Sequence, residues 1–576
     1  MTDAVLTLAA VFIAAGALSL LANHFEYPVV PAYIVAGLLA GTFIAPSDVF
    51  ELAQWGIAFL VFVFGIRVDL SDIRSVLRDA EVAALTQLLV VGVVATGVGY
   101  GLSLSFGFDH PIRNAIYFAA AATFSSTVVG SGVLAAGTQN NLVYGRLASS
   151  IHFFDDIVAI GLVLVLSADA LTDPQAVTSN IGYGVVLLVA GLVFYRYGFP
   201  RLVRAADGSD ELVLMGSISI LIAFIAAAEL AGISIVVGAF AAGLAIQDEG
   251  GEALDVRNGI DSIKDFFAAI FFVTIGALVQ FPTIEIVVLT AVLVALVLLV
   301  NPAVHTAAFL YEGYDARTSF FASSTLAQTS EFALIIAIHA WLLGTIAPSL
   351  FDAIILTAAI TMVVATVVRR FQGQLYTSIV ARLVEGQQTR QVDKHSSVDD
   401  GLEDHVVIVG HGRQGRRVVE QLETLGEDYV VVENDPAKRR GLKTDCKNHV
   451  FGDAMATYPM AKARLPEAKL LVSTVDYEPL SRSLLLRSTE ADIIVRSESA
   501  VEARTLLDAG AMFVTHSNIL AADRLVESIE QVIQGGQGSD TPRTEHRSRL
   551  PSRQTARGGR RTPTEGWGHQ ETRERQ

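Results

Sequence analysis

The chain has 576 residues, of which 52% are hydrophobic and 17% are charged, and its mean hydropathy is +0.49. These values exclude an ordinary soluble protein and are typical of a large membrane domain joined to a soluble domain. The formal net charge of -17 is spread over loops and the C-terminal half, so we expect no nucleic-acid partner.

Apolar segments of membrane-spanning length recur through the first 370 residues. Because about 20 apolar residues are needed to cross the hydrocarbon core of a bilayer, we predict about thirteen spans in an α-helical polytopic domain. A count of twelve is the alternative if the short pair at 211–248 is misread. The predicted ranges are 4–22, 29–46, 51–68, 80–106, 112–136, 143–168, 180–200, 211–230, 232–248, 262–280, 283–310, 318–340 and 345–368.

The positions of lysine and arginine predict the direction of these spans. With thirteen spans and a cytoplasmic C-terminus, the inner loops contain twelve basic residues, whereas the outer loops contain only Arg113. Basic residues in short loops stay on the cytoplasmic side of a membrane. We therefore expect a multi-pass protein of the cell membrane, with its N-terminus outside and its C-terminal domain in the cytoplasm.

Two adjacent acids, Asp155 and Asp156, lie inside the apolar sixth span. An ionised side chain at the centre of a bilayer costs at least about 2.5–3.5 kcal/mol on insertion scales, so we interpret the pair as an ion site. A carboxylate can hold either a proton or a hard cation, and competition between the two is sufficient for exchange. Two neighbouring acids should also titrate as a coupled pair.

The fifth and the twelfth span carry polar residues in mid-segment. Interrupted helices are tolerated at membrane depth where they line a cavity, and their ends offer dipoles and backbone oxygens to ions. The two spans are seven apart, and an odd offset gives corresponding helices opposite directions in the membrane. We therefore predict an inverted repeat whose two broken helices cross at the substrate site. The alternative is that small residues merely let helices pack closely. The polar residues are Thr123, Ser125, Ser126, Thr127, Ser131, Ser323, Ser324, Thr325, Gln328, Thr329, Ser330 and Glu331.

Four motifs carry a resemblance to a known family: SSTVVGSGVL (125–134), HFFDDIVAI (152–160), FFVTIGALV (271–279) and QTSEFALIIA (328–337). Residues 1–370 resemble the monovalent cation:proton antiporter superfamily, in the branch that holds bacterial sodium/proton antiporters and Kef-type potassium efflux systems. The resemblance implies a homodimer in the lipid bilayer. It also implies that each protomer moves a core bundle against a static dimerisation bundle.

The resemblance also implies roles for residues of the ion site. Asp156 would be the essential ion-binding acid, and Asp155 the neighbouring position that is Asp in many electrogenic members and Asn in many electroneutral ones. Ser126, Thr127 and Ser149 are the candidate oxygen donors beside them.

Four further residues could modulate this site. His152 lies one helical turn before the acids and could sense pH, although a histidine that simply packs in the bundle is the more common case. Glu331 matches an acidic position of the family, for which we favour structural pairing. Many electrogenic relatives carry a lysine in the eleventh span, where this chain has Asn301, with His305 one turn later as a stand-in.

The composition changes after residue 370, and we expect a linker at 371–403 before a Rossmann-like α/β domain at 404–533. Gly410, Gly412 and Gly415 form a G-x-G-x-x-G pattern, with Arg413 inside it, directly after the apolar strand HVVIV. Glu433 ends the next strand. The glycines allow a tight turn and close approach of the backbone to a pyrophosphate, and the acid can bind a ribose hydroxyl.

The segments HVFGDA, KLLVSTVD and DIIVRSES predict further strands of the same sheet. Residues 404–530 resemble the TrkA-N (Trk/Kef) nucleotide-binding domain. That resemblance implies a regulatory NAD(H), AMP or other adenine nucleotide with Asp453 near it. The tail at 534–576 is rich in Gly, Ser, Thr, Pro and Arg, which predicts disorder.

We therefore predict a secondary antiporter, not an enzyme, in which protons enter, Na⁺ or K⁺ leaves and a nucleotide adjusts the rate. A nucleotide-gated potassium channel is the nearest alternative, because two strings resemble a selectivity filter, at 96–101 (TGVGYG) and at 181–184 (IGYG). A filter needs a re-entrant loop, and both strings fall within predicted spans. A membrane-tethered dehydrogenase would need a substrate domain, which is not evident after the nucleotide fold.

Overall fold

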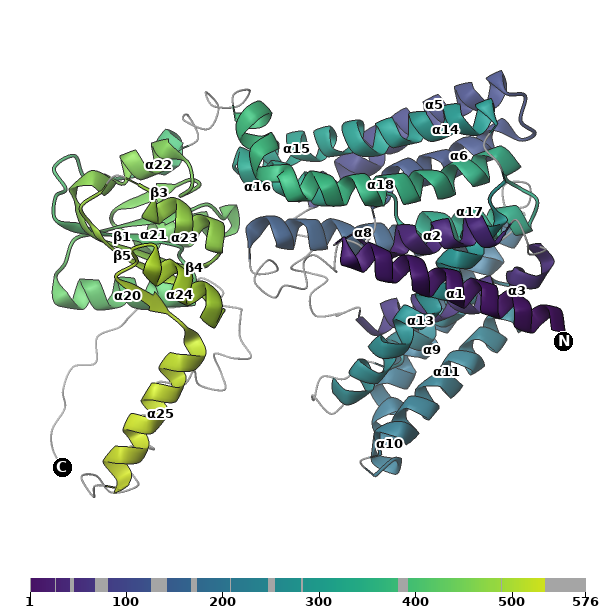
Figure 1. The fold of residues 1–576 in the computed structure, drawn as a ribbon, viewed down its shortest axis with the longest axis horizontal. Coiled ribbons are helices and arrows are strands. Elements are labelled where there is room, and N and C mark those ends of the chain that lie inside the picture. The colour runs from purple at the N-terminus through teal and green to yellow at the C-terminus, as the bar shows by residue number, and fades with distance from the viewer. Residues whose placement is uncertain are drawn as a thin grey trace, which may run out of the picture.

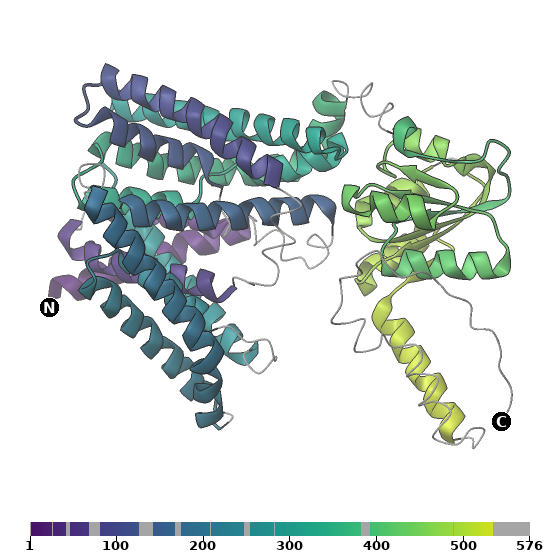
Figure 2. The ribbon, with the colours of Figure 1, turned by 180° about the vertical axis from the view of Figure 1, so that it is seen from behind.

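The structure is a computed structural model with a helical domain and an α/β domain (Figure 1). The α/β domain lies beyond one end of the long helices, and the view from behind shows the same arrangement (Figure 2). The predicted tail at 534–576 and the candidate donors Ser126 and Thr127 lie outside the described residues. The described residues are 2–25, 27–41, 46–67, 81–125, 142–166, 174–207, 209–246, 254–280, 283–381, 392–487 and 489–533.

One group of packed helices forms the first bundle of the helical domain. Helices α2 and α13 cross so closely that a Cβ atom at Gly37 would lie 2.0 Å from the backbone oxygen of Val273, and one at Gly276 would lie 2.1 Å from that of Ile34. Small residues at such crossings let backbones approach within a membrane. The first bundle contains α1 (Thr2–His24), α2 (Val29–Ala40), α3 (Pro46–Arg67), α9 (Pro174–Tyr197), α10 (Phe199–Ala205), α11 (Asp210–Leu230), α12 (Ile235–Leu244) and α13 (Leu254–Leu278).

The second bundle carries the predicted ion site. Its α8 (Val143–Leu166) packs on α16 and α17 and also on α9 and α12 of the first bundle, so this helix lies between the two bundles. The other members are the π turn η1 (Gln87–Val91), α5 (Gly92–Ser105), α6 (Pro111–Thr123), α14 (Ile284–Ala295), the π turn η3 (Leu296–Val300), α15 (Asn301–Glu312), α16 (Ala316–Thr325), α17 (Glu331–Leu342), α18 (Pro348–Leu375) and the π turn η4 (Tyr376–Val380).

Each of the thirteen predicted spans overlaps a helix. Within the described part of the chain, five helices are by themselves long and apolar enough to cross a membrane. The part of the fifth predicted span after Ser125 lies outside the described residues, and the twelfth is divided into α16 and α17. Both filter-like strings are helical, at 96–101 within α5 and at 181–184 within α9. Their backbone carbonyls are therefore used in helix hydrogen bonds, not aimed at a pore.

The end of α6 meets the extended segment that divides the twelfth predicted span in the second bundle. Helix α6 ends at Thr123, and Ser125 forms an antiparallel bridge with Thr329 in the extended segment between α16 and α17. The backbone N–H of Ser330 also donates to the oxygen of Phe124 at 2.9 Å. The Ser330 hydroxyl caps α17 by accepting from Phe332 N at 3.0 Å, which favours a new helix start at this position. We call the residues 123–125 and 326–330 the crossing.

The α/β domain is a six-stranded parallel sheet in the order β3-β2-β1-β4-β5-β6. The first strand, HVVIV, is buried at every position, as expected for a sheet covered by helices on both faces. The strands are β1 (His405–Val409), β2 (Tyr429–Glu433), β3 (His449–Phe451), β4 (Ala468–Asp476), β5 (Asp492–Arg496) and β6 (Phe513–Thr515). The helices are α20 (Arg413–Leu425), α21 (Arg439–Asp445), α22 (Thr457–Lys462), α23 (Glu478–Leu485), α24 (Ala500–Asp508) and α25 (Ser517–Ile533), with short 3-10 turns at Pro436–Lys438 and Leu465–Glu467.

The described residues 392–403 of the expected linker contact this sheet. Ser397 forms an antiparallel bridge with His449 of β3, and the backbone N–H of Asp399 donates to Asn448 Oδ1 at 3.0 Å. The α/β domain is therefore attached to the polypeptide that leads into it before β1 begins.

Candidate functional site

Asp155 lies at the crossing, on the part of α8 that faces the end of α6. Its side chain is 2% exposed. The carboxylate accepts hydrogen bonds from the backbone N–H and the hydroxyl of Ser125, at 2.9 and 2.7 Å, and from the amide of Gln87 at 3.1 and 3.2 Å. A buried charge needs such partners, because burial without them is strongly unfavourable. The structure thus surrounds this acid with polar donors within an apolar bundle.

Asp156 is fully buried on the next position of α8. Consecutive residues of an α-helix point about 100° apart, so the two carboxylates leave the helix in different directions. Asp155 faces the interrupted α6, and Asp156 lies on the adjacent side of the helix.

Gln87 is a site residue that sequence reasoning missed. Its amide nitrogen donates to the backbone oxygen of Thr123 and to Asp155, and its amide oxygen accepts from His305 Nε2 at 2.8 Å. The residue opens the π turn η1, and such turns are frequent at functional sites. The available sequence signal was a polar amide within an otherwise apolar segment.

From the eleventh predicted span, Asn301 contacts the crossing directly and His305 contacts Gln87. The Asn301 amide donates to the backbone oxygens of Ala122 and Thr123 at 3.4 and 3.3 Å. The last carbonyls of a helix lack partners within the helix, so Asn301 and Gln87 together satisfy the end of α6. Asn301 directly follows the π turn η3, just as Gln87 opens η1 seven spans earlier. The position at which the family resemblance implies a lysine thus binds the end of α6 here.

His152 joins the crossing through Ser125. The Ser125 hydroxyl lies 3.1 Å from His152 Nδ1 and donates its proton to Asp155. A hydroxyl has one proton, so its oxygen must accept from the Nδ1–H of His152 while Asp155 is ionised. When Asp155 takes up a proton on this oxygen, it can donate to Ser125, and Ser125 can donate to the imidazole. The arrangement can therefore relay a change in the protonation of Asp155 to His152.

Three described residues of the predicted set, Asp156, Ser149 and Glu331, are not among the contacts named above. The Ser149 side chain is exposed on α8, and Glu331 is buried at the first position of α17. The structure brings together Asp155, His152, Asn301 and His305 of the predicted set, and it adds Gln87 and Ser125.

A second site lies where β1, β2 and β4 end. Gly410 has a φ of 96°, which favours glycine, and a Cβ atom at Gly415 would lie 2.0 Å from the oxygen of Gly410. A Cβ atom at Gly412 would meet nothing within 4 Å. The first glycine therefore makes the turn, the third allows close packing of α20, and the second leaves open space at the helix N-terminus, where a phosphate would bind.

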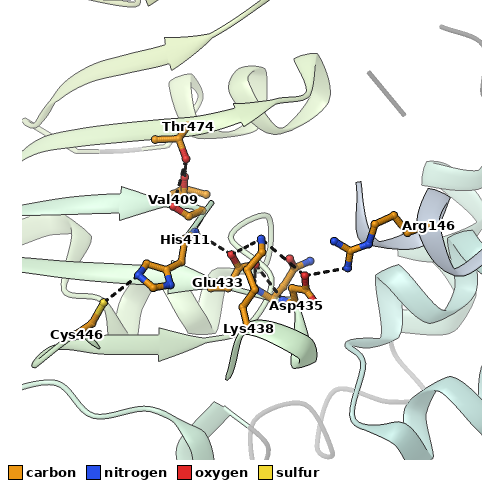
Figure 3. A network of polar contacts seen from close by, with 10 residues as sticks. Arg146, Val409, His411, Glu433, Asp435, Lys438, Cys446 and Thr474 are labelled. Carbon is orange, nitrogen blue, oxygen red and sulfur yellow. Dashed lines mark hydrogen bonds and ion pairs between the residues drawn. The ribbon is translucent and has the colours of Figure 1, made fainter. Parts of the chain in front are cut away.

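Glu433 stands at the end of β2 and is 5% exposed. Its carboxylate accepts from the backbone N–H of His411 at 2.8 Å, from those of Asn434 and Asp435 at 3.0 Å, and from Lys438 Nζ at 2.9 Å (Figure 3). These donors hold the acid in place beside the glycine turn. These four donors fill the four lone-pair sites of the carboxylate, so a ribose hydroxyl would bind to it in place of one of them, such as the Lys438 ammonium.

The strand ends of the α/β domain and part of the helical domain enclose a cavity of about 330 Å³ at this second site. This volume is within the range of small-molecule sites. It is lined by five residues of the predicted nucleotide site, namely Gly410, Gly412, Arg413, Glu433 and Asp453. Sequence reasoning missed other lining residues, because they come from separate strands and from the helical domain. These are Tyr144, Arg317, Thr318, Asn434, Lys438, Thr474, Asp476, Tyr477 and Arg496. The open turn and the basic side chains fit an adenine nucleotide.

Burial raises the pKa of the Asp453 carboxyl to about 6, and the nearby Asp315 acts in the same direction, whereas Arg317 and Arg487 act in the opposite one. When the pKa of a carboxyl is higher in the folded than in the unfolded chain, its contribution to stability is fully present below the unfolded pKa of 3.8. This contribution is lost as the pH rises through the folded pKa of about 6. We therefore expect Asp453→Asn to raise the stability of the nucleotide-free protein at pH 8 by about 1–2 kcal/mol. The gain should shrink as the pH falls toward 4, as thermal unfolding at several pH values would measure.

Asp393→Asn is the control for this prediction. Hydrogen bonds from Lys462 and Tyr458 lower the pKa of the exposed Asp393 carboxyl. Removing this carboxyl charge by Asp393→Asn should therefore not stabilise the protein at pH 8. A gain from Asp453→Asn that stayed the same at every pH would contradict the titration of this carboxyl.

Two protein families match the chain. The family described as sodium/hydrogen exchanger, transmembrane, matches residues 8–371, and the TrkA-N domain matches residues 406–517. The first match extends over more than half of the 576 residues.

The chain is also similar to individual proteins. A protein of Alkalimonas amylolytica provisionally named K(+) efflux antiporter KefB is 27% identical over 538 residues, which are 88% of this chain and 78% of that protein. A protein of Escherichia coli (strain K12) provisionally named cation/proton antiporter YbaL is 27% identical over 563 residues, or 92% of this chain and 98% of that protein. A solved structure of the sodium proton antiporter MjNhaP1 from Methanocaldococcus jannaschii has a TM-score of 0.46 and 14% identity, over 65% of this chain and 97% of that chain.

Proposed function

Because the chain belongs to the sodium/hydrogen exchanger family and carries a TrkA-N domain, we propose that it exchanges K⁺ for protons across the cell membrane under control of a nucleotide. The predicted family, a helical membrane domain and a Rossmann-like TrkA-N domain are confirmed, whereas the thirteen spans and the inverted repeat stay predictions. The similarity to two named cation antiporters supports a Kef-type exchanger. The observation that carries the proposal is the buried acid pair of α8, with Asp155 hydrogen-bonded at the crossing of two interrupted helices.

The proposed exchange uses one site for two ions. Asp156 binds either the cation or a proton. Asp155 supplies a second negative charge beside it, which the hydrogen bonds from Ser125 and Gln87 stabilise. Ser126 and Thr127 remain the proposed oxygen donors to the cation. Because α8 lies between the two bundles, a movement of one bundle against the other would change the side from which the site is reached. An inward proton gradient would then drive the cation out of the cell.

Potassium is the cation that we propose, because one of the similar proteins is named for K(+) efflux. Sodium is the second candidate, since the adjacent aspartates suit either ion. We propose transport, not catalysis, because the relatives carry the names of antiporters. We also propose a homodimer with external N-termini and cytoplasmic nucleotide domains, a membrane domain at 1–370, a linker at 371–403 and a nucleotide domain at 404–533.

The regulatory ligand that we propose is NAD(H), AMP or another adenine nucleotide. The glycine turn, Arg413 and the N-terminus of α20 would hold its phosphate, and Glu433 its ribose. Asp453 lines the same cavity. Since the residues present offer cations for phosphate and a fixed carboxylate for hydroxyl groups, the cavity supports this class of ligand.

Proton flux in proteoliposomes tests the proposal. The purified chain is reconstituted with a pH-sensitive dye inside the vesicles, and K⁺ or Na⁺ is added outside, with and without NADH or AMP. We expect K⁺ to drive proton movement and the nucleotide to change its rate. Movement with Na⁺ alone would reassign the cation. Cation current without proton movement would favour the channel, and an unchanged rate with either nucleotide would remove the regulatory part of the proposal.

A further inference from the structure

The nucleotide cavity is built by both domains. From the helical domain it is lined by Leu142, Val143, Tyr144, Arg317, Thr318 and Phe321, which belong to the beginnings of α8 and α16. We propose that the membrane domain supplies part of the nucleotide site and that Arg317 binds a phosphate group of the ligand. This inference rests on the nucleotide regulation proposed above and adds the membrane-side contact.

Polar contacts join the two sides of the cavity. Arg146 of α8 forms an ion pair with Asp435 at 2.9 Å (Figure 3). Asn434 donates to Asp315 Oδ2 at 3.3 Å and lies 3.4 Å from the hydroxyl of Thr318. Asp315 in turn caps α16 by accepting from Thr318 N at 2.8 Å. The loop that follows β2 is thus attached to the first turn of α16, which carries Arg317.

The side chain of Arg317 is positioned for an anionic ligand. Its guanidinium carbon lies 4.6 Å from the centre of the Phe321 ring and 5.6 Å from that of Tyr376. Such contacts use the flat face of the guanidinium and leave N–H groups at its edge. The planar fork of arginine matches the oxygens of a phosphate in a bidentate manner. Aromatic rings of α16 and η4 therefore hold a phosphate-binding group at the wall of the cavity.

The charges around the cavity favour Arg317 and Arg413 as the phosphate ligands. Of the four basic residues that line it, Lys438 pairs with Glu433 at 2.9 Å and Arg496 pairs with Glu498 at 2.6 Å. Among the described residues, no ion pair within 4 Å includes Arg317 or Arg413, although Arg317 also interacts with the Asp453 carboxyl and shares a hydrogen bond with the Tyr477 side chain. Arg317 belongs to the helical domain and Arg413 to the α/β domain. A phosphate between them would neutralise both charges and link the domains.

The same two helices lead from the nucleotide cavity to the ion site. Along α16, eight residues separate Arg317 from Thr325, which is about 12 Å at 1.5 Å per residue. The next segment holds Thr329, which bridges to Ser125, the hydrogen-bond partner of Asp155. Along α8, Tyr144 precedes Asp155 by eleven residues, or about 17 Å. A ligand that pulls on Arg317 therefore acts on a helix that ends at the crossing.

The test compares AMP with adenosine, which lacks the phosphate, for binding to the full-length chain in detergent. We expect Arg317→Gln to weaken AMP binding by about tenfold to a hundredfold, because a hydrogen bond between charged groups is lost. Adenosine binding should change less than about twofold. Arg317→Lys keeps the charge without the fork and should give an intermediate loss. Arg204→Gln is the matched control, since Arg204 is an exposed arginine of α10, away from the α/β domain (Figures 1 and 2).

The outcomes separate this inference from the proposed function. Equal weakening of AMP and adenosine by Arg317→Gln would mean that the residue only shapes the cavity, and no change would mean that it does not contact the ligand. Either result overturns the inference while the regulatory proposal stands. If the unmodified chain binds neither AMP nor NADH, the regulatory proposal fails and the inference fails with it. If Arg317→Gln unfolds the chain, the binding of AMP and adenosine to Arg317→Lys tests the inference instead. A loss of AMP affinity without a loss of adenosine affinity would support it, and equal losses or no loss would overturn it.

Discussion

Asp156→Asn is expected to reduce cation-driven proton flux to the level of empty vesicles. Asparagine has nearly the volume of aspartate but cannot carry a charge or release a proton, so one site can no longer alternate between the two ions. The measurement is dye-detected proton flux on addition of K⁺, in vesicles that contain equal amounts of each variant.

Asp155→Asn should behave differently from Asp156→Asn. Family resemblance implies that this position is asparagine in many electroneutral members, so exchange should persist at a reduced rate. Its dependence on the membrane potential should fall. The amide also offers one acceptor where the carboxylate accepts from Ser125 and Gln87, so the variant should be less stable by about 1–3 kcal/mol.

Asp109→Asn serves as the control, because Asp109 is an exposed acid in the loop before α6. It should leave the flux unchanged. Full flux in Asp156→Asn would move the ion site away from the acid pair and reduce both aspartates to structural residues.

Gly412→Val is expected to abolish nucleotide binding in a folded protein. Gly412 has a φ of -82°, which any residue adopts, and a Cβ atom there meets nothing within 4 Å. The valine side chain should therefore be accommodated by the protein and occupy the space where the ligand phosphate approaches the backbone. We expect nucleotide affinity to fall by more than about a hundredfold, while the thermal unfolding temperature stays near that of the unmodified chain.

Gly415→Val is the matched variant three residues later. Its Cβ atom would lie 2.0 Å from the backbone oxygen of Gly410, so α20 would have to move away from the sheet. We expect a loss of stability of about 3 kcal/mol or more, as for other overpacked buried positions. Titration with NADH and thermal unfolding of both variants would check the contrast. If Gly412→Val bound NADH normally, the glycine turn would not hold the ligand.

The fold was largely predictable because its signals are local in the sequence. Long apolar segments predict spans, and a run such as HVVIV followed by a glycine turn predicts the first strand and helix of a Rossmann-like sheet. The acids of the sixth span were predictable for the same reason, since a charge in an apolar segment is unusual wherever the segment lies. Even the break between Thr325 and Glu331 was visible as a polar stretch within a span.

By itself, the sequence determined the spans, the acid pair, the glycine turn and the class of each domain. Only the tertiary structure decided which groups surround Asp155, because Gln87, Ser125 and His305 come from segments far apart in the chain. It also placed Asn301 on the end of α6 and left Ser149 exposed. The lining of the nucleotide cavity by Arg317 depends on how two domains meet, and no local pattern of residues carries that information.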